Sequence, residues 1–222
     1  MSYSIALDGP AGAGKSTIAK MVSEKKGCFY VDTGAIYRAM ALFMLRNGIT
    51  AEQTGRIAEK CREADVMVTY ENGEQQVFLN GENVNGKIRT EEIGKMASAS
   101  AAVPAVREWL IGLQRDLAKT HDVIMDGRDI GTCVLPDATV KIYLTASVDV
   151  RAKRRYDEYI AKGIACTLEG IRQDVAARDA QDMNRKIAPL KQAEDAVVVD
   201  SSDMTIEEVV ERIQEICAQK GC

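Results

Sequence analysis

A glycine-rich run near the start of the chain constrains the fold more than any other feature. Gly9-Pro-Ala-Gly-Ala-Gly-Lys-Ser-Thr17 fits the pattern G-x-x-x-x-G-K-[ST] in full. It follows a short apolar run, Tyr3–Asp8, that suits a buried strand, and it precedes Thr17–Lys26, whose apolar residues keep helical spacing. A strand, a glycine-rich turn and a helix in this order predict a phosphate-binding loop. Backbone N–H groups in such a loop turn inward around phosphate oxygens at the positive end of the helix.

This loop predicts a nucleoside triphosphate site with Mg²⁺ as its cofactor. We expect Lys15 to reach the β- and γ-phosphates and Ser16 to hold the Mg²⁺. The residues expected to bind ATP are Gly9, Pro10, Ala11, Gly12, Ala13, Gly14, Lys15, Ser16 and Thr17. The loop alone does not say which reaction follows.

The rest of the chain mostly alternates strand and helix patterns. Further strands are expected at Cys28–Val31, Asp122–Asp126, Thr139–Leu144 and Ala196–Asp200. Helices are expected at Gly34–Asn47, Thr90–Ala101, Pro104–Lys119, after a Ser147 cap, at Thr167–Asp182, and at Thr205–Gln219 with a Thr205/Glu208 capping box. One more helix is expected to open at Thr50, with Gln53 completing its capping box. Five short strands separated by helices predict an α/β fold of the P-loop NTPase type with a doubly wound parallel sheet.

One segment, residues 65–86, has a different period. Asn72-Gly73 and Asn80-Gly81 separate three short strand-like runs, and Asn-Gly between such runs is a strong hairpin signal. The segment therefore predicts a small antiparallel meander. The 222 residues exceed one minimal α/β domain and are too few for two, so this insert accounts for the surplus.

Composition excludes several classes of protein. The formal net charge of −4 argues against a general nucleic-acid-binding surface. No window of 18 uncharged apolar residues predicts a membrane span, and the first residues carry no export signal, so we expect a cytoplasmic protein. The six cysteines are scattered without a Cys-x-x-Cys pair and there is one histidine, which predicts reduced thiols rather than a zinc site.

Two arginine-bearing loops are expected at the carboxyl ends of strands, where open α/β sheets bind ligands. Asp32-Thr-Gly-Ala-Ile-Tyr-Arg38 follows the second strand, and Asp126-Gly-Arg-Asp-Ile-Gly-Thr132 follows the third strand of the core. Arg38 and Arg128 both suit a bidentate grip on a phosphate group. The alternatives are a solvated helix-face arginine for Arg38 and a structural ion pair for Arg128.

A third group of arginines follows Ser147. Arg151-Ala-Lys-Arg-Arg155 places like charges on one helix face, and Arg172, Arg178 and Arg185 come later. Asp157, Glu158, Asp174 and Asp179 are the carboxylates expected to balance these charges if the face is a salt-bridged surface. The other interpretation is a mobile lid that closes cations over a transferring phosphoryl group. From these residues alone both interpretations stay open.

The chain resembles the bacterial cytidylate kinases nearly from end to end. The motifs that carry the resemblance are Gly9–Thr17, Asp32–Ala39, Gly86–Thr90, Val106–Glu108, Asp126–Thr132, Pro136–Ala138 with Lys141–Leu144, and Ala188–Leu190 before Asp195. This family carries an extra antiparallel sheet in its nucleoside-monophosphate-binding region. The resemblance implies one domain over residues 1–222, with a core at about 1–62 and 120–222, an acceptor-binding insert at about 63–119 and a lid at about 147–182.

The resemblance also implies transfer of the ATP γ-phosphoryl group to CMP or dCMP. Tyr37 and Arg38 contact the acceptor, Arg38 at its phosphate, and Arg128 shares that phosphate. Asp129 holds the sugar. Ser98, Arg107 and Asp182 read the cytosine, Arg178 and Arg185 orient the nucleotide, and Arg154 and Arg155 belong to the lid. The implied CMP-binding set is Thr33, Tyr37, Arg38, Ser98, Arg107, Arg128, Asp129, Arg178, Asp182 and Arg185.

The implied catalytic residues are Lys15, Arg128, Asp129, Arg154 and Arg155, and Asp126 is expected to help Ser16 hold Mg²⁺ through water. Thr33 stands where serine also occurs in the family, and Ser16 stands where some members have glycine. The region 151–181 matches by its arginine pattern more than by identity.

Two rival functions remain open at this point. One is a kinase of another small acceptor, such as UMP or AMP, with the same machinery. The other is a nucleotide-dependent switch, although the sequence has no Asn-Lys-x-Asp motif of the kind that reads guanine. For the kinase we expect ATP and CMP or dCMP as partners, no nucleic acid, no membrane, and a monomer.

Overall fold

The computed structural model describes residues 2–222. It contains two compact units, one made of residues 3–28 with 124–222 and the other of residues 29–123. The main sheet has five strands in the order β2-β6-β1-β7-β8, an α/β arrangement. These strands are β1 (Ser4–Asp8), β2 (Phe29–Asp32), β6 (Val123–Gly127), β7 (Val140–Thr145) and β8 (Val197–Asp200). The five predicted strands are confirmed, each with bounds within one residue of expectation.

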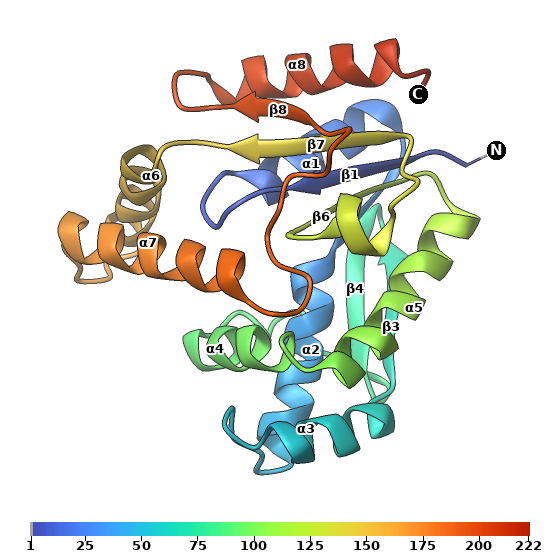
Figure 1. Ribbon diagram of the computed structural model, residues 1–222, viewed down its shortest axis with the longest axis vertical. Helices are drawn as coiled ribbons and strands as arrows, with labels where there is room; N and C mark the ends of the chain where they lie inside the picture. The colour runs from blue at the N-terminus through green and yellow to red at the C-terminus, as the bar shows by residue number, and fades with distance from the viewer. Residues whose placement is uncertain (1) are drawn as a thin grey trace. The chain divides into compact units, whose positions relative to one another are not determined.

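The strand sequences are apolar because parallel strands are covered on both faces. Ile5, Ala6 and Leu7 of β1 are fully buried. β1 pairs in parallel with β7, Ile5 opposite Val140, and β7 pairs in parallel with β8, Ile142 opposite Val197. Figure 1 shows these three strands side by side. Their carboxyl ends therefore meet at one edge of the sheet.

The first unit also contains the helices α1 (Lys15–Lys26), α6 (Val148–Ala161), α7 (Leu168–Asn184) and α8 (Ile206–Gln219). The predicted caps are confirmed: Ser147 accepts the Val150 N–H at 3.2 Å, and Thr205 and Glu208 form a capping box at α8. Helix α1 starts at Lys15, two residues earlier than expected, because Gly14 has a left-handed conformation that turns the chain directly into the helix. A π-helix at Ile130–Val134, labelled η2, was not predicted.

Helices α6 and α7 form a hairpin, here called the lid hairpin, which Figure 1 shows beyond the end of β7. Ala152, Ile171 and Val175 make a small buried cluster between them, and Tyr156 and Tyr159 pack against it. The hairpin thus has apolar contacts of its own.

The second unit contains α2 (Thr33–Arg46), α3 (Thr54–Lys60), a 3₁₀ turn η1 (Cys61–Glu63), α4 (Glu91–Ser100) and α5 (Pro104–Thr120). Its antiparallel sheet, in the order β3-β4-β5, consists of β3 (Val66–Glu71), β4 (Glu74–Leu79) and β5 (Glu82–Asn83). Asn72 and Gly73 both have positive φ, as a two-residue hairpin turn requires. The predicted meander is confirmed.

The expectation of a helix from Thr50 was wrong. Helix α3 begins at Thr54, and its N-cap residue Gln53 makes no side-chain cap bond. The Gln53 Oε1 does accept the Thr50 N–H at 3.1 Å, so half of the predicted capping box forms. It closes a turn before the helix, because the Gln53 N–H donates to the Thr50 carbonyl at the same time.

Two further expectations concern the cysteines and membrane-spanning helices. None of the six cysteines is in a disulfide, as predicted from their spacing. Among residues 2–222, no helix has the length and apolar character needed to cross a membrane.

Candidate active site

The phosphate loop connects β1 to α1 and is tightly packed at its first residue. A Cβ added at Gly9 would lie 1.9 Å from the Leu144 carbonyl oxygen, so no side chain fits there. Lys15 is 6% exposed, and its Nζ donates to the carbonyl oxygens of Gly9 at 2.7 Å and Pro10 at 2.8 Å. The loop therefore holds the ammonium group against its own backbone, and the contact of Lys15 with β- and γ-phosphates stays a prediction of the sequence pattern.

The charge of Lys15 is disfavoured in this environment. Burial lowers the Lys15 pKa well below its ordinary value, and the positive charge of Arg128 lowers it further. The carboxylates of Asp126, Asp8 and Asp182 act in the opposite direction. An anion bound beside Lys15 and Arg128 would remove this repulsion and favour the charged form of Lys15.

Ser16 and Asp126 form the oxygen pair expected for Mg²⁺. Ser16 lies on the first turn of α1, Asp126 lies near the end of β6, and the Ser16 Oγ donates to Asp126 Oδ2 at 2.8 Å. A hydroxyl and a carboxylate suit Mg²⁺, which keeps several waters and is commonly held by one or two protein oxygens and substrate phosphates. Within residues 2–222, no cluster of three or more histidine, cysteine or acidic side chains could hold a metal ion.

Four of the predicted acceptor residues form two ion pairs in the first unit. Arg128 Nε donates to Asp182 Oδ2 at 2.8 Å, and Arg185 Nη2 lies 3.3 Å from Asp129 Oδ1. Arg185 also donates through Nε to the carbonyl of Ala188. Arg128 and Asp129 come from the loop after β6, whereas Asp182 and Arg185 come from the end of α7. We call Arg128, Asp129, Asp182 and Arg185 the acceptor network. The ion pair considered for Arg128 from the sequence is therefore present.

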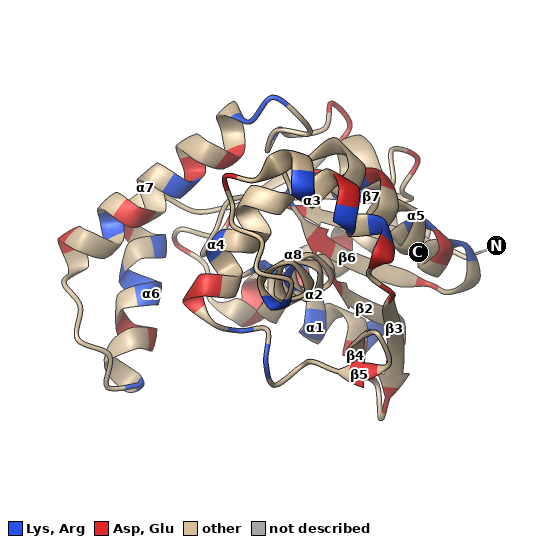
Figure 2. Cartoon of the chain, turned by 90° about the horizontal axis from the view of Figure 1, so that it is seen from below, with Lys and Arg blue, Asp and Glu red and all other residues tan. Residues whose placement is uncertain are grey.

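The lid arginines have different partners from one another. Arg154 donates to Ser201, at 3.2 Å to Oγ and 2.7 Å to the carbonyl oxygen, whereas Arg155 donates to the Tyr159 hydroxyl at 2.8 and 3.1 Å. Arg178 is half-buried on α7. Figure 2 shows residues of both signs on α6 and on α7.

The carboxylates expected to balance these arginines do so only in part. Asp179 pairs with Arg151, at 2.6 Å between Oδ2 and Nη2. Asp157 and Glu158 pair instead with Lys153 and Lys162, each one helical turn away. The arginines of α6 and α7 therefore do not form a face that is balanced by salt bridges alone.

The remaining predicted acceptor residues lie in the second unit. Thr33, Tyr37 and Arg38 share α2, Ser98 lies on α4, and Arg107 on α5 is 4% exposed with its guanidinium 5.8 Å from the centre of the Tyr37 ring. Arg38 Nη1 donates to the Ile88 carbonyl at 3.3 Å.

Arg38 is in a cationic environment. Burial lowers the Arg38 pKa and so does the charge of Arg89, against a smaller opposing effect of Asp32. As with Lys15 and Arg128, two cations that repel each other at a partly buried position favour an anion there.

Asp32 connects α2 to the antiparallel sheet. Its Oδ1 caps α2 by accepting the Ala35 N–H at 2.9 Å, and its Oδ2 accepts from Arg89 at 2.5 Å. The Gln75 side chain on β4 accepts the Asp32 N–H at 2.7 Å and donates to the Asp32 carbonyl at 3.2 Å. The insert therefore fixes the start of the helix that carries Tyr37 and Arg38.

Sequence reasoning did not predict the contacts of four residues near these side chains: Asp8, Gln75, Arg89 and Arg151. Asp8 could have been found, because a carboxylate at the end of a buried strand must have hydrogen-bond donors near it. Gln75 and Arg89 carry no local signal, since their partner is more than 40 residues away along the chain.

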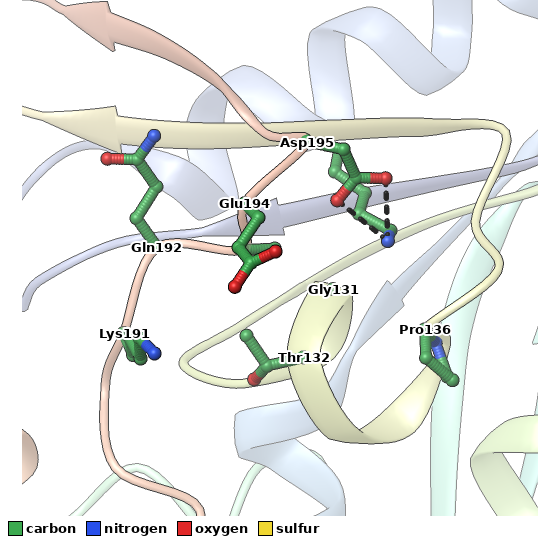
Figure 3. A pocket seen from close by; sticks show the side chains of 9 residues that line it. Gly131, Thr132, Pro136, Lys191, Gln192, Glu194 and Asp195 are labelled. Atoms are coloured by element: carbon green, nitrogen blue, oxygen red, sulfur yellow. Dashed lines mark hydrogen bonds and ion pairs between the residues drawn. The ribbon is translucent and has the colours of Figure 1, made fainter.

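A pocket of about 320 Å³ lies beside η2. Figure 3 shows its lining side chains, with Thr132, Lys191 and Glu194 around it and Lys141 paired with Asp195. None of the residues predicted to bind ATP or CMP lines this pocket.

Comparison with known proteins gives matches over the full chain. A family model described as cytidylate kinase matches residues 5–219. A protein named "Cytidylate kinase" from Thermosipho melanesiensis is 45% identical over 220 residues, 99% of each chain. One of the same name from Lactobacillus gasseri is 47% identical over 216 residues, 97% of this chain and 94% of the relative. The crystal structure of an uncharacterized protein from Eubacterium ventriosum has a TM-score of 0.57 at 11% identity and covers 99% of both chains, a likeness of fold.

Proposed function

The chain belongs to the cytidylate kinase family, and on that premise we propose that it transfers the γ-phosphoryl group of ATP to CMP or dCMP, giving CDP or dCDP and ADP. The observation that supports the assignment for this chain is the effect of Arg128 on Lys15 of the phosphate loop, because the charge of Arg128 adds to burial in lowering the Lys15 pKa. An anionic phosphoryl group bound beside both side chains would relieve the repulsion that lowers the Lys15 pKa.

ATP binds through residues 9–17. The glycines let the backbone N–H groups face the phosphates, and α1 adds the partial positive charge of its N-terminus. When ATP binds, the Lys15 ammonium group exchanges its hydrogen bonds to the Gly9 and Pro10 carbonyls for bonds to phosphate oxygens. The negative charge of the phosphates then raises the Lys15 pKa and stabilises the protonated form. Ser16, with Asp126 through water, would hold Mg²⁺, and the ion would neutralise charge on the phosphates of ATP.

The residues proposed to hold the acceptor nucleotide fall into two groups, each described within its own unit. In the second unit Thr33, Tyr37 and Arg38 contact it, Arg38 at its phosphate, while Ser98 and Arg107 contact its base. In the first unit Arg128 holds the phosphate, Asp129 the sugar and Asp182 the base, and Arg178 and Arg185 orient the nucleotide. The ion pairs Arg128–Asp182 and Arg185–Asp129 support this assignment, because they fix these side chains before the acceptor arrives.

The chemistry requires position and charge rather than a proton acceptor. The attacking atom is a phosphate oxygen that is already ionised at neutral pH, so no general base is needed. Lys15, Arg128, Arg154 and Arg155 stabilise the charge on the moving group, with the last two delivered by the lid hairpin. Closing the lid also excludes water, which is a competing nucleophile.

Base choice follows from hydrogen bonding. Ser98, Arg107 and Asp182 complement the O2, N3 and 4-amino edge of cytosine. UMP has a carbonyl at position 4 and an N3–H, so it leaves buried polar groups unpaired and binds more weakly. Arg107 is 4% and Asp182 is 7% exposed, which makes an unpaired group at either position costly.

The deciding experiment measures coupled ADP release by the purified full chain with ATP and Mg²⁺, in parallel with CMP, dCMP, UMP and AMP. We expect kcat/KM for CMP or dCMP to exceed that for UMP and AMP by about a hundredfold or more. A chain that releases ADP equally with and without acceptor is a nucleotide switch, and a chain that prefers UMP or AMP is a kinase of another specificity. Gel filtration of the same preparation tests the expected monomer.

A further inference from the structure

Asp8 caps the π-helix η2 from a distant part of the chain. It is the last residue of β1, and its carboxyl group is 5% exposed. Asp8 Oδ1 accepts the Ile130 N–H at 2.8 Å, and Oδ2 accepts the Gly131 N–H at 2.7 Å. These are the first two N–H groups of η2, the kind that a helix start leaves without an internal partner.

The residue that ordinarily supplies such a cap is already present. Asp129 occupies the N-cap position of η2, and aspartate is among the best N-cap residues. Yet the Asp129 side chain makes no cap bond. It lies 3.3 Å from Arg185 Nη2 instead. An N-cap side chain accepts from the second or third N–H group of a helix, so Asp129 is the local candidate for the Gly131 N–H, yet Asp8 holds both that group and the Ile130 N–H.

Capping by a buried carboxylate costs free energy of desolvation, which a neutral cap would avoid. Burial raises the Asp8 pKa to about 6 and the charge of Asp129 adds to that effect, although the two donated N–H groups and Lys15 act against it. Of the other charged groups around Asp8, Asp129 is paired with Arg185, and Lys141 is paired with Asp195. A buried carboxylate kept at an energetic cost beside a reaction centre is expected where position matters more than stability.

We propose that Asp8 is a positioning residue for phosphoryl transfer: it takes over the capping of η2 and so leaves the Asp129 side chain to Arg185 and the acceptor. Asp8 also directly precedes Gly9, so one side chain fixes the loop that carries Arg128 and Asp129 against the start of the phosphate loop. The inference rests on the proposed role of Asp129 in acceptor binding.

The packing around Gly131 is consistent with an η2 segment that is held in one position. Gly131 lines the pocket of Figure 3, and a Cβ added there would lie 3.2 Å from Lys141 Cδ and 3.4 Å from Asp8 Oδ2. The Lys141 ammonium is in turn 2.8 Å from Asp195. A side chain at position 131 would therefore press on Lys141 and contact Asp8, which shows that η2 lies close to both residues.

The kinetic test is a double-mutant cycle on Asp8→Asn and Asp129→Asn, read as kcat/KM for CMP and as the Kd for ATP. An asparagine side chain at position 8 can accept one of the two N–H groups with its oxygen, but its NH₂ group cannot accept the other. The Asp129 carboxylate is then expected to turn toward the N–H group that has lost its acceptor. We expect Asp8→Asn to lower kcat/KM for CMP by about tenfold or more, to change the Kd for ATP by less than about threefold, and to have little further effect when Asp129 is already asparagine. Independent, multiplicative effects of the two substitutions would overturn the inference.

Thr205→Ala is the matched control. It removes a side-chain cap from α8, outside the candidate site, and so lowers stability without moving Asp129. We expect its effect on kcat/KM for CMP to be small and independent of Asp129→Asn. If Asp129→Asn alone leaves the CMP kinetics unchanged, the proposed role of Asp129 in acceptor binding is refuted. The capping of η2 by Asp8 does not depend on that result and has its own test.

Hydrogen exchange provides that separate test and needs no change at Asp8. In Asp129→Ala, the Ile130 and Gly131 amides should keep the protection they have in the unmodified chain, because Asp8 holds them. Loss of protection at both amides would identify Asp129 as the cap and refute the inference.

Discussion

Arg151 and Asp179 form a buried, two-pronged ion pair that also reaches the phosphate loop. Arg151 Nη1 and Nη2 lie 3.0 and 2.6 Å from the two carboxylate oxygens of Asp179, and Nη1 donates to the Ala11 carbonyl at 3.0 Å. Nε donates to the Ala146 carbonyl at 2.8 Å. One guanidinium therefore connects α6, α7 and the loop expected to bind ATP.

Asp179→Asn should destabilise the protein and weaken ATP binding more than CMP binding. Removing one charge leaves a buried guanidinium without its counter-ion, which costs about 3 kcal/mol, and the Ala11 contact shifts with it. Urea unfolding and the KM for each nucleotide check this. The matched control is Asp149→Asn, which breaks the exposed Asp149–Arg172 pair between the same two helices and should cost less than about 1 kcal/mol. Equal losses in the two variants would contradict the expected role of burial.

Lys15→Ala and Arg128→Ala should each lower kcat by about a hundredfold or more while the fold stays intact. Both remove a charge that the reaction needs, and neither side chain belongs to the apolar core. Steady-state rates and circular dichroism measure the two effects. Lys25→Ala, an exposed position on α1, serves as the control and should retain the rate of the unmodified chain. Near-normal turnover in either site variant would refute the mechanism.

Ser98→Ala should narrow the discrimination between CMP and UMP. The hydroxyl is proposed to bond the cytosine edge, so its loss should reduce kcat/KM for CMP by about tenfold with a smaller effect on UMP. A competition assay with both acceptors gives the ratio directly. Ser100→Ala on the same helix is the control, because its Oγ donates to the Ala97 carbonyl of its own helix at 3.3 Å. A ratio unchanged by Ser98→Ala would remove this residue from the base site.

The stability of the protein should depend on pH through Asp8. The Asp8 pKa is about 6 in the folded chain against 3.8 for the ordinary carboxyl group. A raised pKa means that the folded state holds the proton more tightly, so this contribution is complete below pH 3.8 and is lost as pH rises through 6. The free energy of unfolding, relative to Asp8→Asn, should fall by about 2 kcal/mol between pH 4 and pH 7. Parallel urea titrations of the two proteins provide the measurement, and a difference that rises with pH would contradict it.

The antiparallel insert should support the acceptor side. Gln75→Ala removes two hydrogen bonds to the Asp32 backbone. It should therefore raise the KM for CMP several-fold and leave the Kd for ATP unchanged. Deletion of residues 65–86 should raise the KM for CMP further. Gln76→Ala is the control, since the Gln76 side chain bonds Asn83 and Asn85 within the insert. A larger loss of ATP binding than of CMP use would assign the insert to the other nucleotide.

Features with local causes were predictable. The phosphate loop, the Asn72–Gly73 hairpin and the Thr205/Glu208 capping box each depend on residues within a few positions of one another. Burial on both faces gives every parallel strand an apolar sequence, so their bounds were correct to one residue. Where two local outcomes compete, the same reasoning was wrong: Gln53 bonds to Thr50, but it closes a turn before α3 rather than starting the helix there.

The amino-acid sequence by itself determined the fold class, the phosphate loop and the residue types of the acceptor loops, because turn chemistry and hydrophobic period act over short distances. Only the tertiary structure decided the partners. Asp8 holds Ile130 across 122 positions and Arg151 holds Ala11 across 140. Both contacts exist because strands and helices far apart in the chain end at the same edge of one sheet. No local pattern encodes which of two aspartates caps η2 or which carboxylate binds Arg151; burial and geometry in the folded chain decide between them.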